Sequence, residues 1–598
     1  MNNSSPDYYN SSIKKIENYF IPIIVFFIPF LFYWRTIAPG IFWGDGPEIT
    51  TASFILGIIH PTGYPLLTLL IKIITSIPIG SIAFRSNLLS CLLSSFSALI
   101  FYFLLKEILE KFLPSSSGDK NEKEIPFSLT ASIISAGGTL LFSSSSTIWF
   151  HSITTEVYIF HIFFLILLLK IGLNVIGKYK EALNNKESLR GIKKNLMLYS
   201  MILGLSFTNH LLTLASLLSL FVLLWLSFNI YRKVLNIKQY FYFFIKCFLI
   251  FLIGLSIYVI LPIRAKANPS LNWGDPENLK NMVWVISGGE FKIYKFLKEE
   301  PEVPFTFFSY IDFFRARLSQ LFLWFPNQWL SHKNDNLFFS IIILITVFAF
   351  ALLGFKYLYK KEKIISIYLI SPIPLSLFFL FTYNIPDIDG YFLSIFPVVI
   401  IFFIFTITKI LYHFGKRFRG GASFIFSLIF FICCIFTFSI HLPYQDLSNS
   451  VNAQKFAYRT LNFLPFDSMI LTQVDNDIFP LWYIQNVENF RRDVTVVGAT
   501  FLRCGWYSKY FTIEQLKRFK IKIEDRVPLT EYAFFYSILK NAIWENIDSK
   551  KVFGFLKHPV LEKDLRLIPM GSTLTNEEFK EDEDYYLPSV ILYRYEKK

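Results

Sequence analysis

Two carboxylates and an imidazole follow the first long apolar run of the chain. Residues 19–37 are long enough to cross a bilayer core, which takes about 20 mostly apolar residues. Asp45 and Glu48 lie just beyond this run, and His60 follows one short helix later. Carboxylates at a membrane surface can act as general bases, and residues one helical turn apart can face one pocket. The alternative is a solvated Gly- and Pro-rich turn, with Glu48 favoured only by the dipole of the next helix.

The composition is that of a polytopic membrane protein. Of 598 residues, 53% are hydrophobic and only 17% are charged, which excludes an ordinary soluble protein. The net charge of +14 does not indicate a nucleic-acid partner, because Lys and Arg cluster in short loops between apolar runs. The five cysteines show no metal-ligand spacing, so we expect neither a disulfide framework nor a zinc site.

The charge bias sets the expected topology. Lys14 and Lys15, just before the first span, predict a cytoplasmic N-terminus. We expect eleven membrane spans, at 19–37, 85–105, 127–148, 157–176, 196–212, 213–230, 240–262, 337–355, 364–382, 391–413 and 421–441. Residues 64–78 are apolar but short and carry Lys72, so we expect a helix at the interface; a span there would put every later basic cluster on the wrong side.

This topology brings the unusual polar residues to one face of the membrane. They lie in the outer loops 38–84 and 263–336 and in outer turns, and they include Asp45, Glu48, His60, His151, Glu156, Asn209, His210, Arg264 and Asp275. An ionisable group near membrane depth costs on the order of 3 kcal/mol by insertion scales, so it indicates function by default. One outward-facing polar cavity would satisfy these residues together. Carboxylates suit general-base chemistry there, while Arg264 and Lys266 suit a lipid phosphate.

Several of these residues also have a structural interpretation. Glu156 begins a span and can serve the helix dipole alone. Asn209 and His210 sit at a tight hairpin, where Asn suits the turn. Asn272 and Asp275 stand in a loop rich in Gly and Pro, where both can be turn formers.

Several motifs, taken in order, resemble one protein family. The acid pair, the His-Pro-x-Gly segment after it and Arg85 at the start of the next span look like the first outer loop of C-type (GT-C) membrane glycosyltransferases, the superfamily of the protein O-mannosyltransferases. The closer resemblance is to a family long labelled as a domain of unknown function. Its eukaryotic member is an endoplasmic-reticulum protein O-mannosyltransferase outside the better-known group. The motifs that carry this resemblance are 43–65, 155–158, 204–210, 261–264, 271–276, 385–392, 475–483 and 492–494.

The resemblance spans about residues 19–510 and implies a fold and a mechanism. The fold would be a GT-C transmembrane domain of about eleven helices with a small extracytoplasmic α/β domain. Asp45 would be the general base, a role worth about 10² to 10⁴ in rate, and Glu48 would orient the acceptor or the sugar. The residues implied for the donor phosphate are His60, Arg85, Arg264 and Lys266. The residues implied for substrate are Glu156, Asn209, His210, Asn272, Asp275, Asp387 and Tyr391.

The chain departs from the family pattern at one position. Pro47 stands before Glu48, where the family commonly has a small residue, and Pro is tolerated at the first helical position. Some C-type enzymes place a divalent ion on such acids. No hard-ligand set is evident here, so we expect neither a metal nor another cofactor. We expect His151 and His161 to pack or hydrogen-bond inside the protein, and we leave them out of the site.

The expected function is inverting transfer of a sugar, mannose by the resemblance, from a polyprenyl-phosphate donor to protein Ser or Thr hydroxyls. The expected place is the extracytoplasmic face of a bacterial inner membrane. The partners are then the lipid donor, an acceptor protein or glycan, and the membrane, with no nucleic acid. The alternatives are a transferase for a lipid-linked glycan or lipopolysaccharide, and a lipid-linked glycan transporter or flippase. Acids in loops rather than at the bilayer midplane, and no visible internal repeat, favour the enzyme.

Residues 442–598 predict a separate α/β domain outside the membrane, after a transmembrane domain at 1–441. A strand at 468–472, a helix at 478–488 and a strand at 494–498 make a βαβ pattern. Further elements are expected as helices at about 513–519 and 530–547 and strands near 551–556 and 588–594. The Asp475-Asn476-Asp477 run follows the first strand, where open α/β sheets place ligands; the alternative is a helix cap by Asp477.

Overall fold

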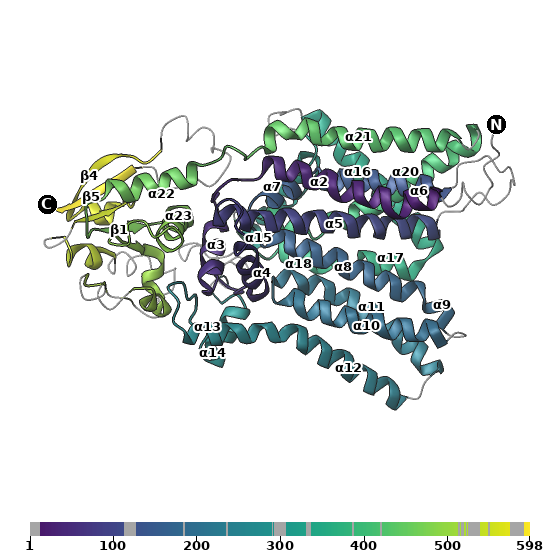
Figure 1. Cartoon of the computed structure of the whole chain (residues 1–598), viewed down its shortest axis with the longest axis horizontal. Helices are drawn as coiled ribbons and strands as arrows, with labels where there is room; N and C mark the ends of the chain where they lie inside the picture. The colour runs from purple at the N-terminus through teal and green to yellow at the C-terminus, as the bar shows by residue number, and fades with distance from the viewer. Residues whose placement is uncertain are drawn as a thin grey trace.

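The protein, seen in a computed structural model, is a bundle of long helices with a small α/β unit at one end (Figure 1). The structure describes residues 12–112, 127–182, 186–234, 237–289, 291, 307–330, 337–385, 388–418, 421–511, 515, 519–521, 523, 539–547, 551–574 and 591–598.

Among these residues, nine helices are long and apolar enough to cross a membrane, or ten if one bent pair counts as a span. The nine are Ser12–Thr36, Ile82–Phe112, Tyr158–Gly177, Leu211–Asn229, Lys238–Lys266, Phe338–Lys361, Lys363–Leu380, Phe396–Phe414 and Ala422–Gln445. The bent pair is α6 (Phe127–Ser143) and α7 (Ser146–Ile153), with an angle of 68° between them. The expected span 127–148 is therefore broken rather than straight.

The expected span 196–212 corresponds to α10 (Lys186–Phe207), which lies within the bundle beside α12 (Ile237–Leu255) (Figure 1). α10 is not among the nine apolar helices, because its first half carries several charged residues. Gly204 and Gly254 allow the two helices to touch, because a Cβ on Gly204 would lie 2.2 Å from the carbonyl oxygen of Phe251. With α10 and the bent pair, a helix stands at each of the eleven expected spans.

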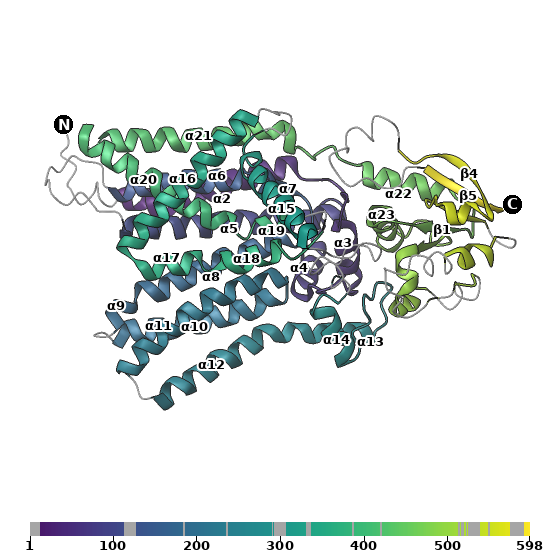
Figure 2. The ribbon, with the colours of Figure 1, turned by 180° about the vertical axis from the view of Figure 1, so that it is seen from behind.

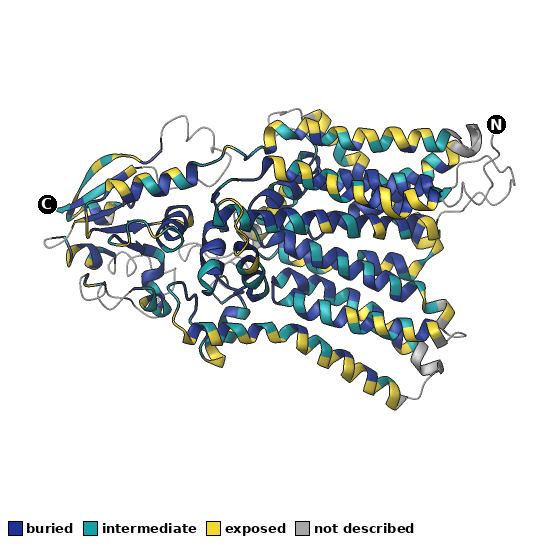
Figure 3. Cartoon of the chain, viewed as in Figure 1, coloured by how far each residue is buried: buried dark blue, intermediate teal, exposed yellow. Residues whose placement is uncertain are grey.

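The remaining elements of the bundle follow the expected order. They are η1 (Ile16–Phe20), α2 (Ile21–Thr36), α5 (Ile82–Phe112), α8 (Tyr158–Gly177), α9 (Tyr179–Ala182), η2 (Leu211–Leu214), α11 (Ala215–Val234), η3 (Ser256–Val259), α16 (Leu337–Lys361), α17 (Lys363–Ile370), α18 (Pro372–Leu380), α20 (Phe396–Phe418) and α21 (Gly421–Gln445). Figure 3 shows that α8 is mostly buried while α21 carries a long exposed face. Of the best apolar window in each, 78% is buried in α8 and 17% in α21. The outer helices thus present an apolar surface suited to lipid.

Short helices gather at the end of the bundle that faces the α/β unit (Figure 1). They are α3 (Gly46–Ile55), α4 (Pro65–Thr75), α13 (Ile260–Lys266), α14 (Leu279–Ile286) and α19 (Asp389–Phe392). The segment around α9 is rich in basic residues, among them Lys178, Arg190, Lys193 and Lys194, and α9 lies at the opposite end of the bundle (Figure 1). α4 has 11 residues, too few to span, as expected for residues 64–78.

The expected outer loop 263–336 also contains a long helix that the sequence analysis missed. This helix is α15 (Phe307–Asn327), which lies beside α16 (Figure 2). Trp324 and Phe325 of α15 pack against Phe396 of α20 at ring distances of 5.3 and 6.0 Å. The loop is therefore tied to the bundle by aromatic packing.

The α/β unit contains a five-stranded sheet in the order β2-β1-β3-β5-β4. Its strands are β1 (Met469–Thr472), β2 (Thr495–Gly498), β3 (Val552–Gly554), β4 (Leu565–Ser572) and β5 (Ile591–Lys597). Its helices are α22 (Asn452–Phe463), α23 (Asp475–Asn486), η5 (Ala499–Arg503), η6 (Gly505–Tyr510) and α26 (Pro559–Glu562). β1 pairs with β2 and β3 in parallel, and β5 pairs with β3 and β4 antiparallel.

The βαβ prediction is confirmed, because α23 connects the parallel strands β1 and β2. α23 begins at Asp475 and not at 478, since the Asp477 side chain accepts hydrogen bonds from the backbone of Gln473 and Val474 and caps the first turn. Of the expected helix 530–547, residues 539–544 are helical, while residues 530–538 and most of the expected helix 513–519 lie outside the described residues. β4 and α22 were not expected.

One continuous cluster of buried apolar side chains runs through the bundle and the α/β unit, and a smaller cluster lies among α2, α5 and α6. At the junction, the Trp43 ring lies 5.9 Å from that of Phe456, and the Leu447 backbone N–H donates to the Thr36 carbonyl at 3.0 Å. The α/β unit is therefore packed directly against the loops that follow α2. The division of the chain at residue 441 stays a prediction.

Candidate functional site

The turn before α3 keeps the Asp45 carboxylate out of helix capping. Gly44 has a φ of +85°, a conformation that suits Gly, and Pro47 occupies the first turn of α3. Within the described residues, the Asp45 side chain accepts no capping hydrogen bond from the backbone N–H groups of the first turn of α3, although Asp45 stands at the capping position. The side chain is 37% exposed, and its Oδ2 lies 3.7 Å from Nε2 of His60. The carboxylate is thus accessible and has a cationic neighbour.

Glu48 has a different environment from Asp45. Its side chain is fully buried, its Oε1 accepts the backbone N–H of His60 at 2.9 Å, and its Oε2 lies 2.7 Å from Nδ1 of the same residue. Both oxygens are therefore used to hold His60. The expected contact of Glu48 with a sugar or an acceptor stays a prediction.

The two carboxylates hold His60 in its protonated form. Burial lowers the pKa of His60, but attraction by Glu48 and then by Asp45, the hydrogen bond to Glu48 and the more distant Asp475 together raise it to about 9. The imidazolium at neutral pH is therefore a donor to Glu48 and a positive charge beside Asp45. The two acids therefore differ in what they can do. Both lie beside the His60 cation, but only the Asp45 carboxylate is accessible.

The raised pKa of His60 predicts a pH-dependent stability. A folded-state pKa of about 9 against an ordinary 6.5 means that the stabilisation is complete below pH 6.5 and is lost as the pH rises through 9. We expect the melting temperature in detergent to fall across that window. His60→Asn, which cannot carry the charge, should melt lower at pH 7 and show a shallower fall. An equally steep fall in His60→Asn would assign the effect to other groups.

The loop between α7 and α8 packs on the turn that holds Asp45. A Cβ on Gly46 would lie 3.1 Å from the Thr155 carbonyl oxygen, and one on Gly44 would lie 3.6 Å from Oε1 of Glu156. Glu156 is half-buried. The structure therefore brings the predicted residue Glu156 to the Asp45 turn.

Asn87 fastens this arrangement and was missed by the sequence analysis. Its Oδ1 accepts the hydroxyl of Thr155 at 2.7 Å, and its Nδ2 donates to the carbonyls of Ala38 at 2.9 Å and Gly40 at 3.1 Å. The side chain is 3% exposed. A polar amide inside an apolar helix was the available signal, because buried polar groups take hydrogen-bond partners.

A cluster of aromatic rings adjoins His60. The His210 ring stacks on Tyr64 at 6.0 Å and lies 5.8 Å from Tyr158 and 5.7 Å from Tyr391. His60 lies 5.1 Å from Tyr64. Two predicted substrate residues, His210 and Tyr391, are thus brought next to the His60 segment, and Tyr158 is an additional member.

His151, which the sequence analysis left out of the site, is also at this cluster, with its ring 5.1 Å from that of Tyr158. The predicted residue Asp387 lies outside the described residues.

Three buried polar atoms around residues 58–62 have no hydrogen-bond partner among the residues that the structure describes. They are Oδ1 of Asn209, Oδ1 of Asn272 and Nε1 of Trp273. The backbone carbonyl oxygen of Asn209 accepts a hydrogen bond from the Thr62 hydroxyl. The backbone of Asn272 pairs with that of Ile58 in a parallel bridge, and the Trp273 ring lies 6.1 Å from the His60 ring. Unpaired buried polar atoms are rare and call for a water or a ligand.

Asp275 is held in an ion pair with the α/β unit. Its Oδ2 lies 2.7 Å from Nζ of Lys509, which also contacts Glu277 at 2.7 Å, and its Oδ1 accepts from Asn272 at 3.0 Å. Asp275 therefore has a structural task in orienting the Asn272 side chain. A direct contact of Asp275 with substrate stays a prediction.

Besides His60, which the two acids hold, three residues were predicted for the donor phosphate, and they differ in how many hydrogen bonds they already make. Arg85 donates to the carbonyls of Thr75, Ile79 and Gly80 and so closes the turn between α4 and α5. Arg264 donates from Nε to Leu56 at 2.7 Å, at the C-terminal end of α3, and its Nη1 has no partner within the described part of the chain. Lys266 is exposed. Arg264 and Lys266 thus retain donors for an anion, and the role of Arg85 stays a prediction.

Comparisons with known proteins find two family models that match segments of this chain. The model of the protein O-mannosyl-transferase TMEM260 N-terminal domain matches residues 45–236, and the model of the TMEM260-associated domain 2 matches residues 453–542. Two separate segments of this chain are thus similar to TMEM260. The first matched segment begins at Asp45 and includes Glu48, His60 and Glu156, and the second includes α23. The expected resemblance to this family is therefore confirmed.

The relatives that these comparisons find are distant. The protein O-mannosyl-transferase TMEM260 of Mus musculus is 29% identical over 262 residues, which are 43% of this chain and 32% of the mouse protein. The chain thus matches about a third of the length of that relative. Among solved structures, ArnT from Cupriavidus metallidurans has a TM-score of 0.47 at 8% identity, covering 96% of this chain and 97% of ArnT. The archaeal oligosaccharyltransferase AglB from Archaeoglobus fulgidus has a TM-score of 0.45 at 11% identity, covering 90% and 70%.

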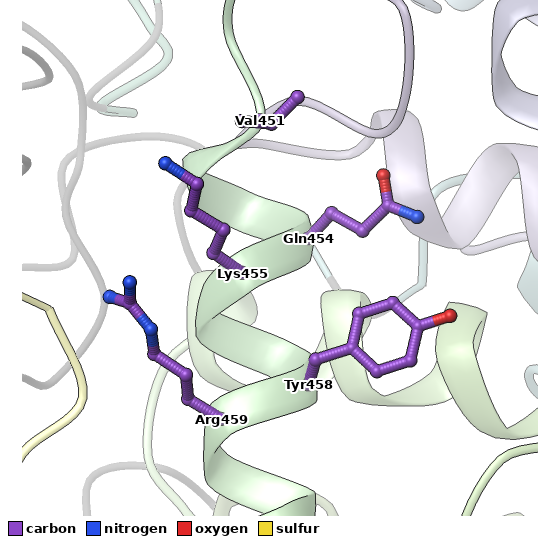
Figure 4. A pocket seen from close by; sticks show the side chains of 5 residues that line it. All are labelled: Val451, Gln454, Lys455, Tyr458 and Arg459. Carbon is purple, nitrogen blue, oxygen red and sulfur yellow. The ribbon is translucent and has the colours of Figure 1, made fainter.

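A surface hollow of about 280 Å³ on α22 contains none of the predicted residues. It is lined by Val451, Gln454, Lys455, Tyr458 and Arg459, and Figure 4 shows Lys455 and Arg459 on one side and Gln454 and Tyr458 on the other. The last two hydrogen-bond Glu488. This hollow stands apart from the carboxylates of the Asp45 turn.

No group of three or more His, Cys, Asp or Glu side chains that could hold a metal ion occurs among the described residues. The expectation that the site works without a metal or another cofactor stays a prediction.

Proposed function

We propose that the protein transfers a sugar, mannose by family, from a polyprenyl-phosphate donor to a protein Ser or Thr hydroxyl with inversion. The observation that carries this proposal is the unequal pair of acids around His60. Asp45 is accessible and takes no part in capping, whereas Glu48 is fully buried and hydrogen-bonded twice to His60. A general base must be accessible to receive a proton, as Asp45 is. A group that positions another side chain is best buried and hydrogen-bonded, as Glu48 is.

In the proposed reaction, the acceptor oxygen attacks the anomeric carbon while the bond from that carbon to the phosphate oxygen breaks. Asp45 takes the acceptor proton, and the lipid phosphate leaves with the electron pair of the broken bond. The imidazolium of His60 lies beside Asp45 and favours its charged form before the proton arrives. The unpaired buried atoms of Asn209, Asn272 and Trp273 would bind sugar or acceptor hydroxyls.

The departing phosphate requires cations on the side of the anomeric carbon opposite to the base. Arg264 is bound at the far end of α3, roughly 14 Å along the helix from Asp45. An in-line displacement puts the attacking and leaving oxygens on opposite sides of the carbon, so this separation suits Arg264 and Lys266 as phosphate ligands. α13, which carries both residues, ends the Lys238–Lys266 span and so places them where a lipid headgroup would lie.

The proposed location is the extracytoplasmic face of a bacterial inner membrane. The short helices with the site and the α/β unit lie at one end of the bundle, and the basic segment at α9 lies at the other (Figure 1). Basic loops favour the cytoplasmic side, so the site and the α/β unit would face the periplasm.

The test is a transfer assay with the purified full chain in detergent. Polyprenyl-phosphate-mannose is supplied with periplasmic proteins in one reaction and with a lipid-linked glycan in another, and transferred hexose is measured by mass spectrometry. Mannose on protein supports the proposal. Transfer only to the glycan would replace the acceptor, and no transfer from mannose or other lipid-phosphate sugars would overturn the reaction class. Movement of the lipid-linked glycan across proteoliposomes would then identify a flippase.

Arg264→Gln should weaken donor binding. The variant removes a guanidinium that retains a donor for phosphate, and a charge-assisted hydrogen bond contributes about 1.5 to 3 kcal/mol. We expect the KM for the lipid donor to rise about 10-fold or more, with a smaller change in kcat. Initial rates over a range of donor concentration measure this effect.

Arg35→Gln is the matched control for this variant. Arg35 lies in the last turn of α2 at the same end of the bundle, is 64% exposed and contacts Asp446 at 3.4 Å. Its loss should leave the donor KM unchanged. A wild-type KM in Arg264→Gln would remove Arg264 from the phosphate site.

A further inference from the structure

The first turn of α23, in the α/β unit, lies directly against the turn that carries Asp45. Oδ1 of Asn476 accepts the backbone N–H of Gly44 at 2.7 Å, and Gly44 immediately precedes Asp45. Asn476 is 4% exposed, so the bond is shielded from water. We propose that Asn476 is a positioning residue for Asp45, so that the first turn of α23 holds the turn that carries the base. The inference rests on the proposed role of Asp45 as the base.

Asn476 is itself held firmly. The next residue, Asp477, is fully buried and accepts the backbone N–H groups of Gln473 and Val474 at 3.0 and 3.2 Å. Farther along α23, the hydroxyl of Tyr483 accepts the backbone N–H of Ala83 at 3.2 Å. α23 therefore contacts both ends of the outer loop 38–84, through Gly44 and through Ala83.

The Gly44 turn needs such an anchor. Its φ of +85° is available to Gly at little cost, but Gly also has the most freedom to leave that conformation. Misplacement of a catalytic group by about 1 Å can cost 10² in rate. The Asn476 side chain, which is fixed to the sheet through α23, accepts the Gly44 N–H and therefore keeps Asp45 in position beside His60.

The charges around Asp45 explain why an amide suits this position. The titratable groups that face the Asp45 turn are Glu48 on α3, His60 and Tyr64 on the following segment, Glu156 before α8, and Asp475 on α23. Three of these groups are carboxylates and one is an imidazolium. An amide supplies the acceptor for Gly44 without adding a further negative charge, whereas a carboxylate would disfavour the charged form of Asp45.

The test compares Asn476→Leu and Asn476→Asp in the full chain, using transfer from polyprenyl-phosphate-mannose. Asn476→Leu removes the acceptor, and we expect kcat to fall about 100-fold with little change in the donor KM. Asn476→Asp keeps the acceptor and adds a charge, so kcat should recover at high pH while the acid limb of the pH profile moves up by about one pH unit. A merely structural role would not move the pH profile.

A second measurement does not depend on activity. Hydrogen exchange of a peptide covering residues 41–49 should be faster in Asn476→Leu than in the wild type and near the wild type in Asn476→Asp. The matched control is Asn546→Leu. Asn546 is also buried in the α/β unit and accepts a backbone N–H, from Lys520 at 3.1 Å. It should leave kcat and this peptide unchanged.

The outcomes separate this inference from the proposed function. Normal kcat and normal exchange in Asn476→Leu would overturn the positioning role, and so would equal losses in Asn476→Leu and Asn546→Leu. A wild type that transfers no sugar would overturn the proposed function, and exchange at residues 41–49 alone would then decide whether Asn476 holds the turn.

Discussion

Asp45→Asn is expected to remove sugar transfer almost completely while the protein stays folded. The amide cannot accept the proton of the acceptor hydroxyl, and loss of a general base costs about 10² to 10⁴ in rate. The fold should tolerate the change, because the carboxylate is 37% exposed and lies 3.7 Å from its His60 partner. The measurement is single-turnover transfer with saturating polyprenyl-phosphate sugar, together with the melting temperature.

Asp446→Asn is the control for this experiment. Asp446 is a carboxylate just beyond α21, 26% exposed, that contacts Arg35. Its loss should change neither rate nor melting temperature by much, since exposed ion pairs contribute about 0 to 1 kcal/mol. Full transfer by Asp45→Asn would move the search for the base to Glu156, a half-buried carboxylate beside this turn.

Glu48→Gln is expected to affect both stability and activity. It leaves the buried imidazolium of His60 without the carboxylate that holds it at 2.7 Å. Removing one partner of a buried charge pair costs about 3 to 5 kcal/mol, and His60 should then lose its proton at neutral pH. We expect a lower melting temperature at pH 7, a flatter dependence of that temperature on pH near 9, and a transfer rate lower by about 10².

Glu277→Gln is the matched change at an exposed ion pair. Glu277 is 37% exposed and contacts Lys509 at 2.7 Å, so its loss should cost about 1 kcal/mol or less. If Glu48→Gln and Glu277→Gln had equal effects on the melting temperature, the buried Glu48–His60 pair would not be a structural centre of the site. If Glu48→Gln were stable but inactive, Glu48 would contact the substrate, as the sequence analysis expected.

Local patterns in the sequence predicted most of the helices. Runs of apolar residues and the clusters of Lys and Arg between them indicate where a chain crosses a bilayer, and helices occur at all eleven expected spans. The pattern of apolar residues did not predict the bend between α6 and α7, because a break within a helix depends on how the helix packs. It also failed for α15, whose aromatic face is recognisable only once α20 lies beside it.

The sequence predicted Asp45, Glu48 and His60 in one outer loop, but only the family resemblance distinguished their roles, and local chemistry did not. Two carboxylates one turn apart have the same local chemistry. Their difference arises because Glu48 is enclosed and hydrogen-bonded twice to His60, whereas Asp45 stays partly exposed. That difference is a matter of burial and distance.

The sequence by itself determined the class of protein, the resemblance to a family, the order of the long apolar helices and the residues of the loop 38–84, because periodicity and motifs are local properties of the chain. The tertiary structure alone decided which residues surround that loop. Asn87, Tyr158 and Asn476 come from three distant segments, and the Gly44–Asn476 bond joins residues 432 positions apart. Such contacts depend on how helices pack and where the α/β unit docks, and no local pattern in the sequence records them.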